Sequence, residues 1–157
     1  MCFTRKMRCD DKEVSRHDVP MYVSLLKKLG VQKIDLSGGE PLLYKHLPFL
    51  VRECAAQSIS ATITTSGVGT PGNINWICEN WRLFSRVIVS LDGPENIHNE
   101  LRGSDSAFAG AKKLLLLLRS KGCENLRINT LLTRKNIGIG SCDNLREIVS
   151  IIQPLEW

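Results

Sequence analysis

Helix-like and strand-like segments alternate along the sequence, and this alternation restricts the folds open to the chain. Four segments have the short, apolar or β-branched character of strands, and a helical pattern separates each from the next. They are "VQKIDLS" at 31–37, "ISATITTSG" at 59–67, "SRVIVSLDGP" at 85–94 and "NLRINTLLT" at 125–133. Such an order predicts an α/β fold with a parallel sheet and right-handed crossovers, either open or curled into a barrel.

The helical segments carry start and stop signals. The first, at 16–30, has Asp18 as a candidate cap, Pro20 in its first turn and Gly30 after its last apolar residue. Further helices are predicted at 46–57, 72–81, 106–122 and 142–154, and "LEW" at 155–157 is expected to begin another strand.

Length and charge narrow the class of protein. The chain has 157 residues, enough for one domain with a buried core. Its longest apolar run, 114–118, is far shorter than the ~20 residues that cross a bilayer, so no membrane span is expected. The net charge of +5 is scattered, which favours a solvated basic surface and makes a nucleic-acid partner unexpected.

The six cysteines are widely spaced and contain no C-x-x-C motif, so a disulfide framework is not expected. No apolar segment follows the charged N-terminal residues, so a signal peptide is not expected and a reducing cytoplasm is the predicted location. Cys54 and Cys78 lie in apolar helical patterns, where a free thiol behaves as a small hydrophobe. The full set is Cys2, Cys9, Cys54, Cys78, Cys123 and Cys142.

Small polar residues gather where the predicted strands end. The carboxyl ends of parallel strands meet at one edge of a sheet, where ligands bind in α/β folds. Four such ends share this character: Ser37-Gly38-Gly39-Glu40-Pro41, Thr65-Ser66-Gly67, Ser90-Leu91-Asp92-Gly93-Pro94 and Asn129-Thr130. Short hydrogen-bonding side chains and glycine would suit a small polar ligand laid across this edge.

The pair Gly38-Gly39 has the most direct interpretation. A lone glycine pair is more often an ordinary strand-to-helix turn, but the other strand ends favour a ligand site here. Without a Cβ, the two residues leave their backbone groups open to an ammonium or hydroxyl group of a ligand. Glu40 would add charge near a bound cation, and Pro41 would stiffen the entry into the helix.

At these residues the sequence resembles the radical S-adenosylmethionine (SAM) enzymes. The resemblance is carried by "LSGGEPLL", "ITTSG", "VSLDGPENIHNELRG" and "RINTLLTRKN", and it covers nearly the whole chain in the same order of elements. It implies a partial TIM-type barrel, with about four of its six strands present in residues 1–157. The expectation is therefore a single radical SAM core domain that is truncated at both ends.

The resemblance also implies cofactors and ligand contacts. Such enzymes hold a [4Fe–4S] cluster on three cysteines, and SAM is reductively cleaved there to a radical that abstracts hydrogen. Gly38, Gly39 and Glu40 would bind the methionine amino group, beside Pro41. The remaining expected contacts are Ser66 near the ligand, Ser90 and Asp92 at the ribose, and Arg102 and Asn129 at the carboxylate or ribose. A surface position is the alternative for Arg102, whose fork suits a carboxylate.

One element of the family pattern is missing, because the sequence contains no C-x3-C-x2-C. Cys2 aligns with the third cluster cysteine, and the first strand and first two cysteines are expected upstream of residue 1. A separate metal site made by Cys2 and Cys9 is disfavoured. Two alternatives to a truncated enzyme core remain open: a cluster-free module that binds SAM or a nucleotide, and an inactive fragment.

The reaction is not determined by these motifs. "SLDGPENIHNELRG" is similar to branches that modify peptides or mature cofactors, and "INTLLTRKN" weakly resembles the viperin-like, nucleotide-modifying branch. The substrate could thus be a peptide or a small molecule, and a reductant such as flavodoxin or ferredoxin is implied. His46 and His98 are expected at the surface, Trp76 and Trp81 in packing, and Cys123 and Cys142 outside the site.

Overall fold

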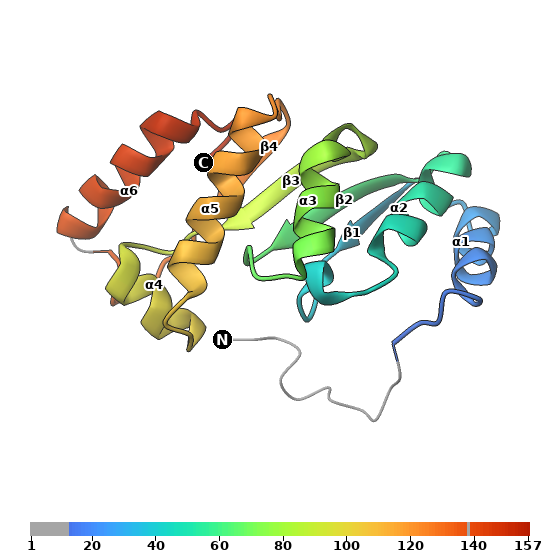
Figure 1. Ribbon diagram of the computed structural model, residues 1–157, viewed down its shortest axis with the longest axis horizontal. Coiled ribbons are helices and arrows are strands. Elements are labelled where there is room, and N and C mark those ends of the chain that lie inside the picture. The colour runs from blue at the N-terminus through green and yellow to red at the C-terminus, as the bar shows by residue number, and fades with distance from the viewer. Residues whose placement is uncertain (1–12, 138) are drawn as a thin grey trace.

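The protein is a single curved sheet with helices on one face (Figure 1). The computed structural model describes residues 13–137 and 139–157, without the side chains of 139–144. Its four strands lie in the order β1-β2-β3-β4, and every neighbouring pair is parallel. They are β1 (Lys33–Leu36), β2 (Ser60–Thr65), β3 (Phe84–Ser90) and β4 (Leu126–Asn129). The predicted α/β fold and its four parallel strands are confirmed.

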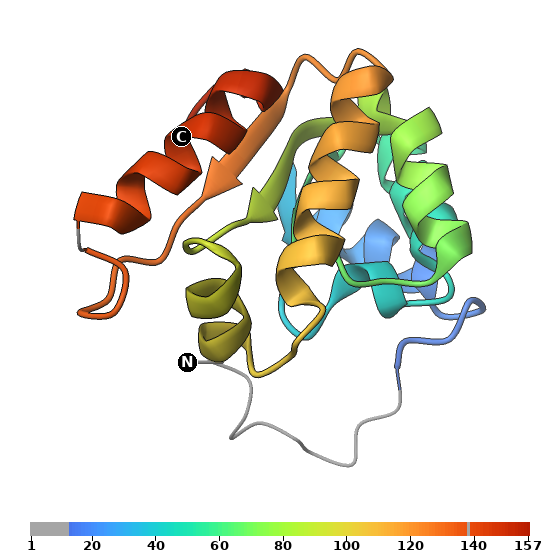
Figure 2. The same cartoon turned by 60° about the vertical axis from the view of Figure 1, so that its left-hand side comes forward.

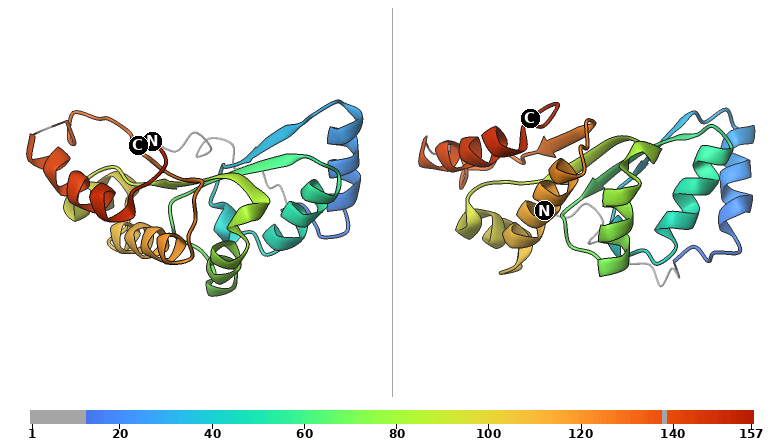
Figure 3. Two further views of the ribbon diagram at one scale, coloured as in Figure 1. Left: turned by 90° about the horizontal axis from the view of Figure 1, so that it is seen from above. Right: turned by 45° about the horizontal axis from the view of Figure 1, so that its top comes forward.

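Six α-helices connect and flank the strands in the described part of the chain. They are α1 (Val19–Lys28), α2 (Leu47–Ala56), α3 (Pro71–Glu79), α4 (Glu95–Arg102), α5 (Ala107–Ser120) and α6 (Ile139–Ile152). Figure 3 shows α2, α3 and α5 below the sheet, whose other face is concave and carries no helix of the described residues. The arrangement resembles part of the wall of a barrel, and the open face of the sheet corresponds to the inside of that barrel.

The core lies between the sheet and these helices because side chains alternate across each strand. In β2, Ala61, Ile63 and Thr65 are buried, whereas Thr62 and Thr64 between them remain half-exposed on the open face. Residues of β3 and α5 continue the same cluster. Trp81 is buried in this core and Trp76 packs against it, which confirms their predicted packing roles.

The helix boundaries differ from the sequence prediction in two places. Between β3 and β4 the structure has two helices, α4 and α5, where one was predicted. Pro20 does lie in the first turn of α1, but the Asp18 side chain makes no capping bond, because its carboxylate accepts from the Ser15 hydroxyl at 2.7 Å. Gly103, in the left-handed conformation, ends α4.

The last residues extend the sheet beside β4, as expected for "LEW". Leu155 N donates to Leu126 O at 2.8 Å, and Ile128 N donates to Glu156 O at 3.1 Å. Glu156 forms a parallel bridge with Arg127. The C-terminal segment therefore begins to cover the β4 edge, in the same parallel direction as the strands (Figure 2).

Candidate functional site

The predicted ligand residues lie at the carboxyl ends of the strands, where all but Ser66 line one of two cavities. The first has a volume of about 460 Å³ and lies at the end of β1, with Gly38, Gly39, Glu40 and Pro41 in its wall. The second, of about 880 Å³, lies at the ends of β3 and β4 and is lined by Ser90, Asp92, Arg102 and Asn129 among others.

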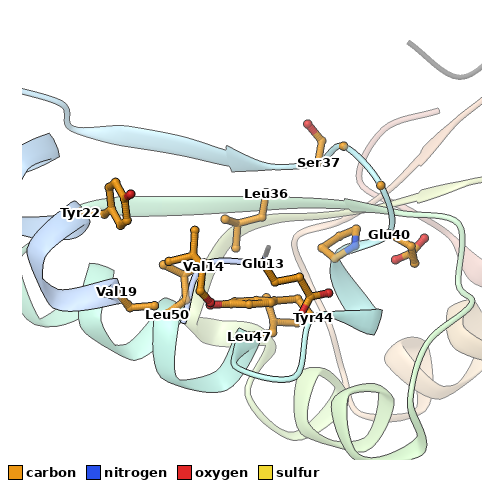
Figure 4. A pocket seen from close by; sticks show the side chains of 13 residues that line it. Glu13, Val14, Val19, Tyr22, Leu36, Ser37, Glu40, Tyr44, Leu47 and Leu50 are labelled. Atoms are coloured by element: carbon orange, nitrogen blue, oxygen red, sulfur yellow. The ribbon is translucent and has the colours of Figure 1, made fainter. Parts of the chain in front are cut away.

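The first cavity is largely apolar, with one polar end formed by the glycine turn (Figure 4). Tyr44 and Leu47 border it, and the Tyr44 hydroxyl donates to Val14 O at 2.8 Å. Gly38 and Gly39 both have positive φ, 75° and 60°. A Cβ built on Gly39 would meet nothing within 4 Å, so this turn presents bare backbone to the cavity.

Glu40 is fixed by four hydrogen bonds from neighbouring backbone and hydroxyl groups. Its Oε1 accepts from Leu42 N at 3.1 Å and from Thr65 Oγ1 at 2.5 Å. Its Oε2 accepts from both the backbone N, at 2.8 Å, and the hydroxyl, at 2.5 Å, of Ser66. The carboxylate therefore ties the glycine turn to the end of β2. Ser66, which lines neither cavity, reaches the site through Glu40.

The turn that follows Glu40 is anchored from α3. Pro41 begins the short 3₁₀ turn η2 (Pro41–Leu43) and is buried. Asn73 Nδ2 donates to Leu42 O and to Tyr44 O, both at 2.9 Å. Asn73 was not singled out from the sequence, and Thr65 was named only as part of a polar strand end, although both support the glycine turn.

The second cavity combines a polar floor with an apolar rim. Ser90 and Asn129 are register partners at the ends of β3 and β4, so they lie side by side on the open face. Leu131, Leu132 and Trp157 border the same cavity and are exposed. An amphipathic ligand with a flat apolar part would suit such a lining.

Arg102 reaches this cavity from the last turn of α4. Its Nε donates to Asp92 Oδ2 at 2.6 Å, and its side chain is 32% exposed. Asp92 itself is 1% exposed, and its other oxygen accepts from Leu131 N at 2.9 Å. The structure thus places Asp92 beneath Arg102, with both carboxylate oxygens bonded within the protein.

His98 is fully buried, which corrects the expectation of a surface histidine. Its Nδ1 accepts from Asp92 N at 2.9 Å, and its ring stands edge-on to Phe108. Burial lowers the pKa of His98, an effect that the nearby Asp92 opposes and Arg102 reinforces. The ring is therefore neutral at pH 7, with its proton on Nε2.

This burial predicts a pH-dependent stability. Because the folded-state pKa of His98 lies below its unfolded value of about 6.5, the unfolded chain binds more protons as the pH falls. The stability associated with neutral His98 should be fully present above about pH 6.5 and be lost as the pH drops through the lowered folded pKa. Urea denaturation of wild type and His98→Asn across this range measures it. Equal pH dependence in the two proteins would contradict it.

The cysteines described by the structure do not lie at the site. Cys54, Cys78 and Cys123 are free and buried, and burial raises the pKa of Cys54 and Cys123 to about 11 and also raises that of Cys78. Cys123 thus stays outside the site, as expected. Within 13–137 and 139–157, no three His, Cys, Asp or Glu side chains are grouped as metal ligands. Cys2 lies outside the described residues, as does the side chain of Cys142.

No described helix is both long and apolar enough to cross a membrane.

Solved structures share this fold. Streptococcus suis SuiB bound to S-adenosylmethionine superposes with a TM-score of 0.75 at 20% identity, over 98% of this chain and 34% of that one. Its complex with the precursor peptide SuiA gives a TM-score of 0.76 at 21% identity, over 94% and 32% of the two chains. At these identities the likeness shows the fold, a partial TIM barrel.

Curated sequences and a family model give the relationship. A probable GTP 3′,8-cyclase of Sulfurisphaera tokodaii is 30% identical over 87% of this chain and 44% of its own length. An AdoMet-dependent heme synthase of Oleidesulfovibrio alaskensis is 26% identical over 80% of this chain and 32% of its own. This chain therefore spans about a third to a half of such relatives. Residues 1–138 match the model of the Radical SAM superfamily, and the chain belongs to that superfamily.

Proposed function

We propose that this chain is the SAM-binding core domain of a radical SAM enzyme. The observation that carries the proposal is the pairing of two features at one sheet edge. One is the Gly38-Gly39 turn at the first cavity, where a Cβ on Gly39 would meet nothing within 4 Å, and the other is the Arg102 guanidinium held at the second. The open turn suits an ammonium group and the guanidinium suits a carboxylate, and SAM carries both.

The residues present fit SAM. The open turn at Gly38 and Gly39 can accept the methionine amino group on backbone carbonyls, because no side chain covers Gly39. Arg102 can donate to the carboxylate through its terminal nitrogens, since only its Nε is bonded to Asp92. Ser90 and Asn129 offer hydroxyl and amide groups to the ribose.

For Glu40 and Asp92 we propose roles that differ from the direct ligand contacts expected from the sequence. Glu40 holds the glycine turn against the end of β2, and Asp92 holds Arg102. Both therefore orient the ligand-binding groups, and Pro41 and Ser66 support the same turn. Leu131, Leu132 and Trp157 would exclude water from the adenosine side.

A [4Fe–4S] cluster is part of the proposal, with Cys2 as its one ligand assigned in this chain. The described cysteines do not fit it, because they are buried as neutral thiols away from the two cavities. With SAM bound, the cluster would supply the one electron that cleaves SAM. The 5′-deoxyadenosyl radical released in this way would abstract hydrogen from the substrate.

The substrate is proposed to be a peptide or a small molecule. The peptide is supported by the SuiB complex with its precursor peptide and by the mycofactocin maturase MftC of Mycobacterium ulcerans, 26% identical over 87% of this chain. A nucleotide is supported by the probable GTP 3′,8-cyclase. A flavodoxin- or ferredoxin-type reductant would supply the electron. The free thiols of the described cysteines are consistent with a cytoplasmic location.

The alternative is a module that binds SAM or a nucleotide without redox chemistry. It is supported by the hydrogen-bonding groups that line the second cavity, among them Ser90, Arg102 and Asn129, which could hold SAM or a nucleotide without a metal ion. Iron and sulfide analysis after anaerobic reconstitution of a longer chain, which includes the two cluster cysteines expected upstream of residue 1, separates the two functions. Four irons per chain, with 5′-deoxyadenosine formed under reduction, support the enzyme, and SAM binding without iron supports the module.

A matched pair of glycine variants tests the SAM site itself. Gly39→Ala and Gly30→Ala both place a Cβ at positive φ, 60° and 78°, with nothing within 4 Å. Each should therefore lose a similar amount of stability, about 1–2 kcal/mol. Only the Gly39 methyl group stands at the cavity. We expect Gly39→Ala to weaken SAM binding at least about tenfold, equivalent to ~1.4 kcal/mol, and Gly30→Ala to leave it unchanged.

Isothermal titration calorimetry with SAM measures both affinities. Equal SAM affinity in the two variants, with wild type binding normally, would place the ligand away from the glycine turn.

A further inference from the structure

A cluster of buried polar side chains lies beneath the second cavity, where the turn after β3 meets the turn after β4. Its members, Asp92, His98 and Asn136, are 1%, 0% and 3% exposed. They come from the β3–α4 turn, from α4 and from the β4–α6 turn (Figure 2). We call them the Asp92 cluster. Most buried polar groups in proteins are hydrogen-bonded, so the bonds of these three residues show what the cluster holds in place.

Asp92 is bonded at every polar atom. Its Oδ2 accepts from Arg102 Nε, and its Oδ1 accepts from Leu131 N. Its backbone N–H donates to His98 Nδ1 at 2.9 Å, and its carbonyl accepts from Asn136 Nδ2 at 2.5 Å. The carboxylate is therefore fixed from both its backbone and its side chain, and Arg102 is the cation that compensates its buried charge.

The two remaining members are bonded to the backbone of Asp92, and Asn136 also lines the second cavity. Asn136 uses its second amide hydrogen on Leu131 O at 2.6 Å, so it joins the two turns. His98 reaches the Asp92 N–H through Nδ1 alone, and its Nε2 has no partner among the described residues. Neutral His98 is the acceptor that this geometry needs, because a protonated ring would place a second donor against the same N–H.

We infer that His98 is a positioning residue that fixes the Arg102 guanidinium, through Asp92, for a carboxylate in the second cavity. Within the described residues, the Arg102 side chain makes no hydrogen bond or ion pair other than the one to Asp92. Its terminal nitrogens therefore remain for a ligand. Loss of the His98 acceptor would let the Asp92 backbone turn, and the guanidinium would move with the carboxylate. This inference rests on the proposed function, since SAM provides the carboxylate.

Two substitutions of nearly equal shape separate positioning from packing. His98→Asn keeps an acceptor near the place of Nδ1, and His98→Leu removes it. Leu has as many side-chain heavy atoms as Asn and is the bulkier of the two, so a loss seen in His98→Leu and not in His98→Asn does not come from a larger cavity. Calorimetry with SAM and with decarboxylated SAM then reports on the carboxylate alone. We expect His98→Leu to lower the affinity for SAM about tenfold and to leave the affinity for decarboxylated SAM unchanged. His98→Asn should bind SAM with the affinity of wild type.

A second measurement does not need the ligand. The Arg102 Nε–H should give a solvent-protected signal in ¹H–¹⁵N spectra, identified by its loss in Arg102→Lys. The signal should persist in wild type and His98→Asn and exchange rapidly in His98→Leu, even if SAM does not bind. Failure of wild type to bind SAM would then overturn the proposed function alone. Two results would overturn the positioning role. One is equal solvent protection of the Arg102 Nε–H in both His98 variants, and the other is an equal loss of affinity for SAM and decarboxylated SAM in His98→Leu.

Discussion

Replacing Glu40 by Ala is expected to lower the free energy of unfolding by about 3 kcal/mol and to abolish measurable SAM binding. The carboxylate accepts four hydrogen bonds, from Leu42 N, Thr65 Oγ1 and both donors of Ser66. Hydrogen bonds to charged groups contribute about 1.5–3 kcal/mol, and the donors left behind lose their partner in a half-buried place. The glycine turn would also lose its attachment to β2. Urea denaturation and calorimetry measure the two effects.

Two further variants show whether the four bonds are the cause. Glu124→Ala removes an exposed carboxylate that makes no side-chain hydrogen bond within the described residues, and it should change stability by less than about 0.5 kcal/mol. Glu40→Gln keeps the shape but turns an acceptor into a donor that faces donors, so it should resemble Glu40→Ala. Wild-type stability and SAM affinity in Glu40→Gln would show that the carboxylate is not needed there.

The order of strands could be predicted from sequence because its signals are local. Short apolar or β-branched runs identified β1 to β4, and glycine and proline marked most of their ends. Since parallel strands bring their carboxyl ends to one edge, the positions of Gly38, Ser90 and Asn129 followed from the order of elements alone.

The partners of the site carboxylates could not be predicted, because they come from distant parts of the chain. Glu40 follows β1, whereas Thr65 ends β2 and Ser66 comes directly after it. Asn136, which bonds to Asp92, lies in the loop between β4 and α6. Spacing along the sequence gives no indication of such contacts. A carboxylate beside a glycine turn therefore suggested a ligand contact, which stays a prediction, and gave no sign of the bonds by which Glu40 holds that turn to β2.

His98 was misjudged for a different reason. Its helix, "ENIHNELR", carries Glu95, Asn96, Asn99 and Glu100, and so polar a segment is typical of a solvated surface. The turn after β3 needs one acceptor for the Asp92 N–H, and the helix supplies it from its inward face. This need is a property of the folded backbone and leaves no mark in the composition of the helix.

Gly67→Ala is expected to lower the free energy of unfolding by about 3 kcal/mol or more. Gly67 has a φ of 84°, which costs a residue with a side chain about 1–2 kcal/mol. A Cβ there would also lie 2.6 Å from Ala111 Cα and 2.8 Å from Ala111 N, in the backbone of α5. Because helix backbone cannot move aside as a flexible side chain can, we add an overpacking cost of about 1–3 kcal/mol.

Gly122→Ala separates the two costs, since Gly122 has a φ of 70° but nothing within 4 Å of a built Cβ. Gly122→Ala should lower the free energy of unfolding, measured by urea denaturation, only by the conformational cost of about 1–2 kcal/mol. Equal losses in the two variants would mean that α5 does not approach the β2 turn as closely as described. The close approach also bears on the site, because Gly67 N donates to Thr65 Oγ1, which in turn donates to Glu40. Pushing α5 away from this turn should therefore weaken SAM binding in Gly67→Ala as well, while Gly122→Ala binds SAM as wild type does.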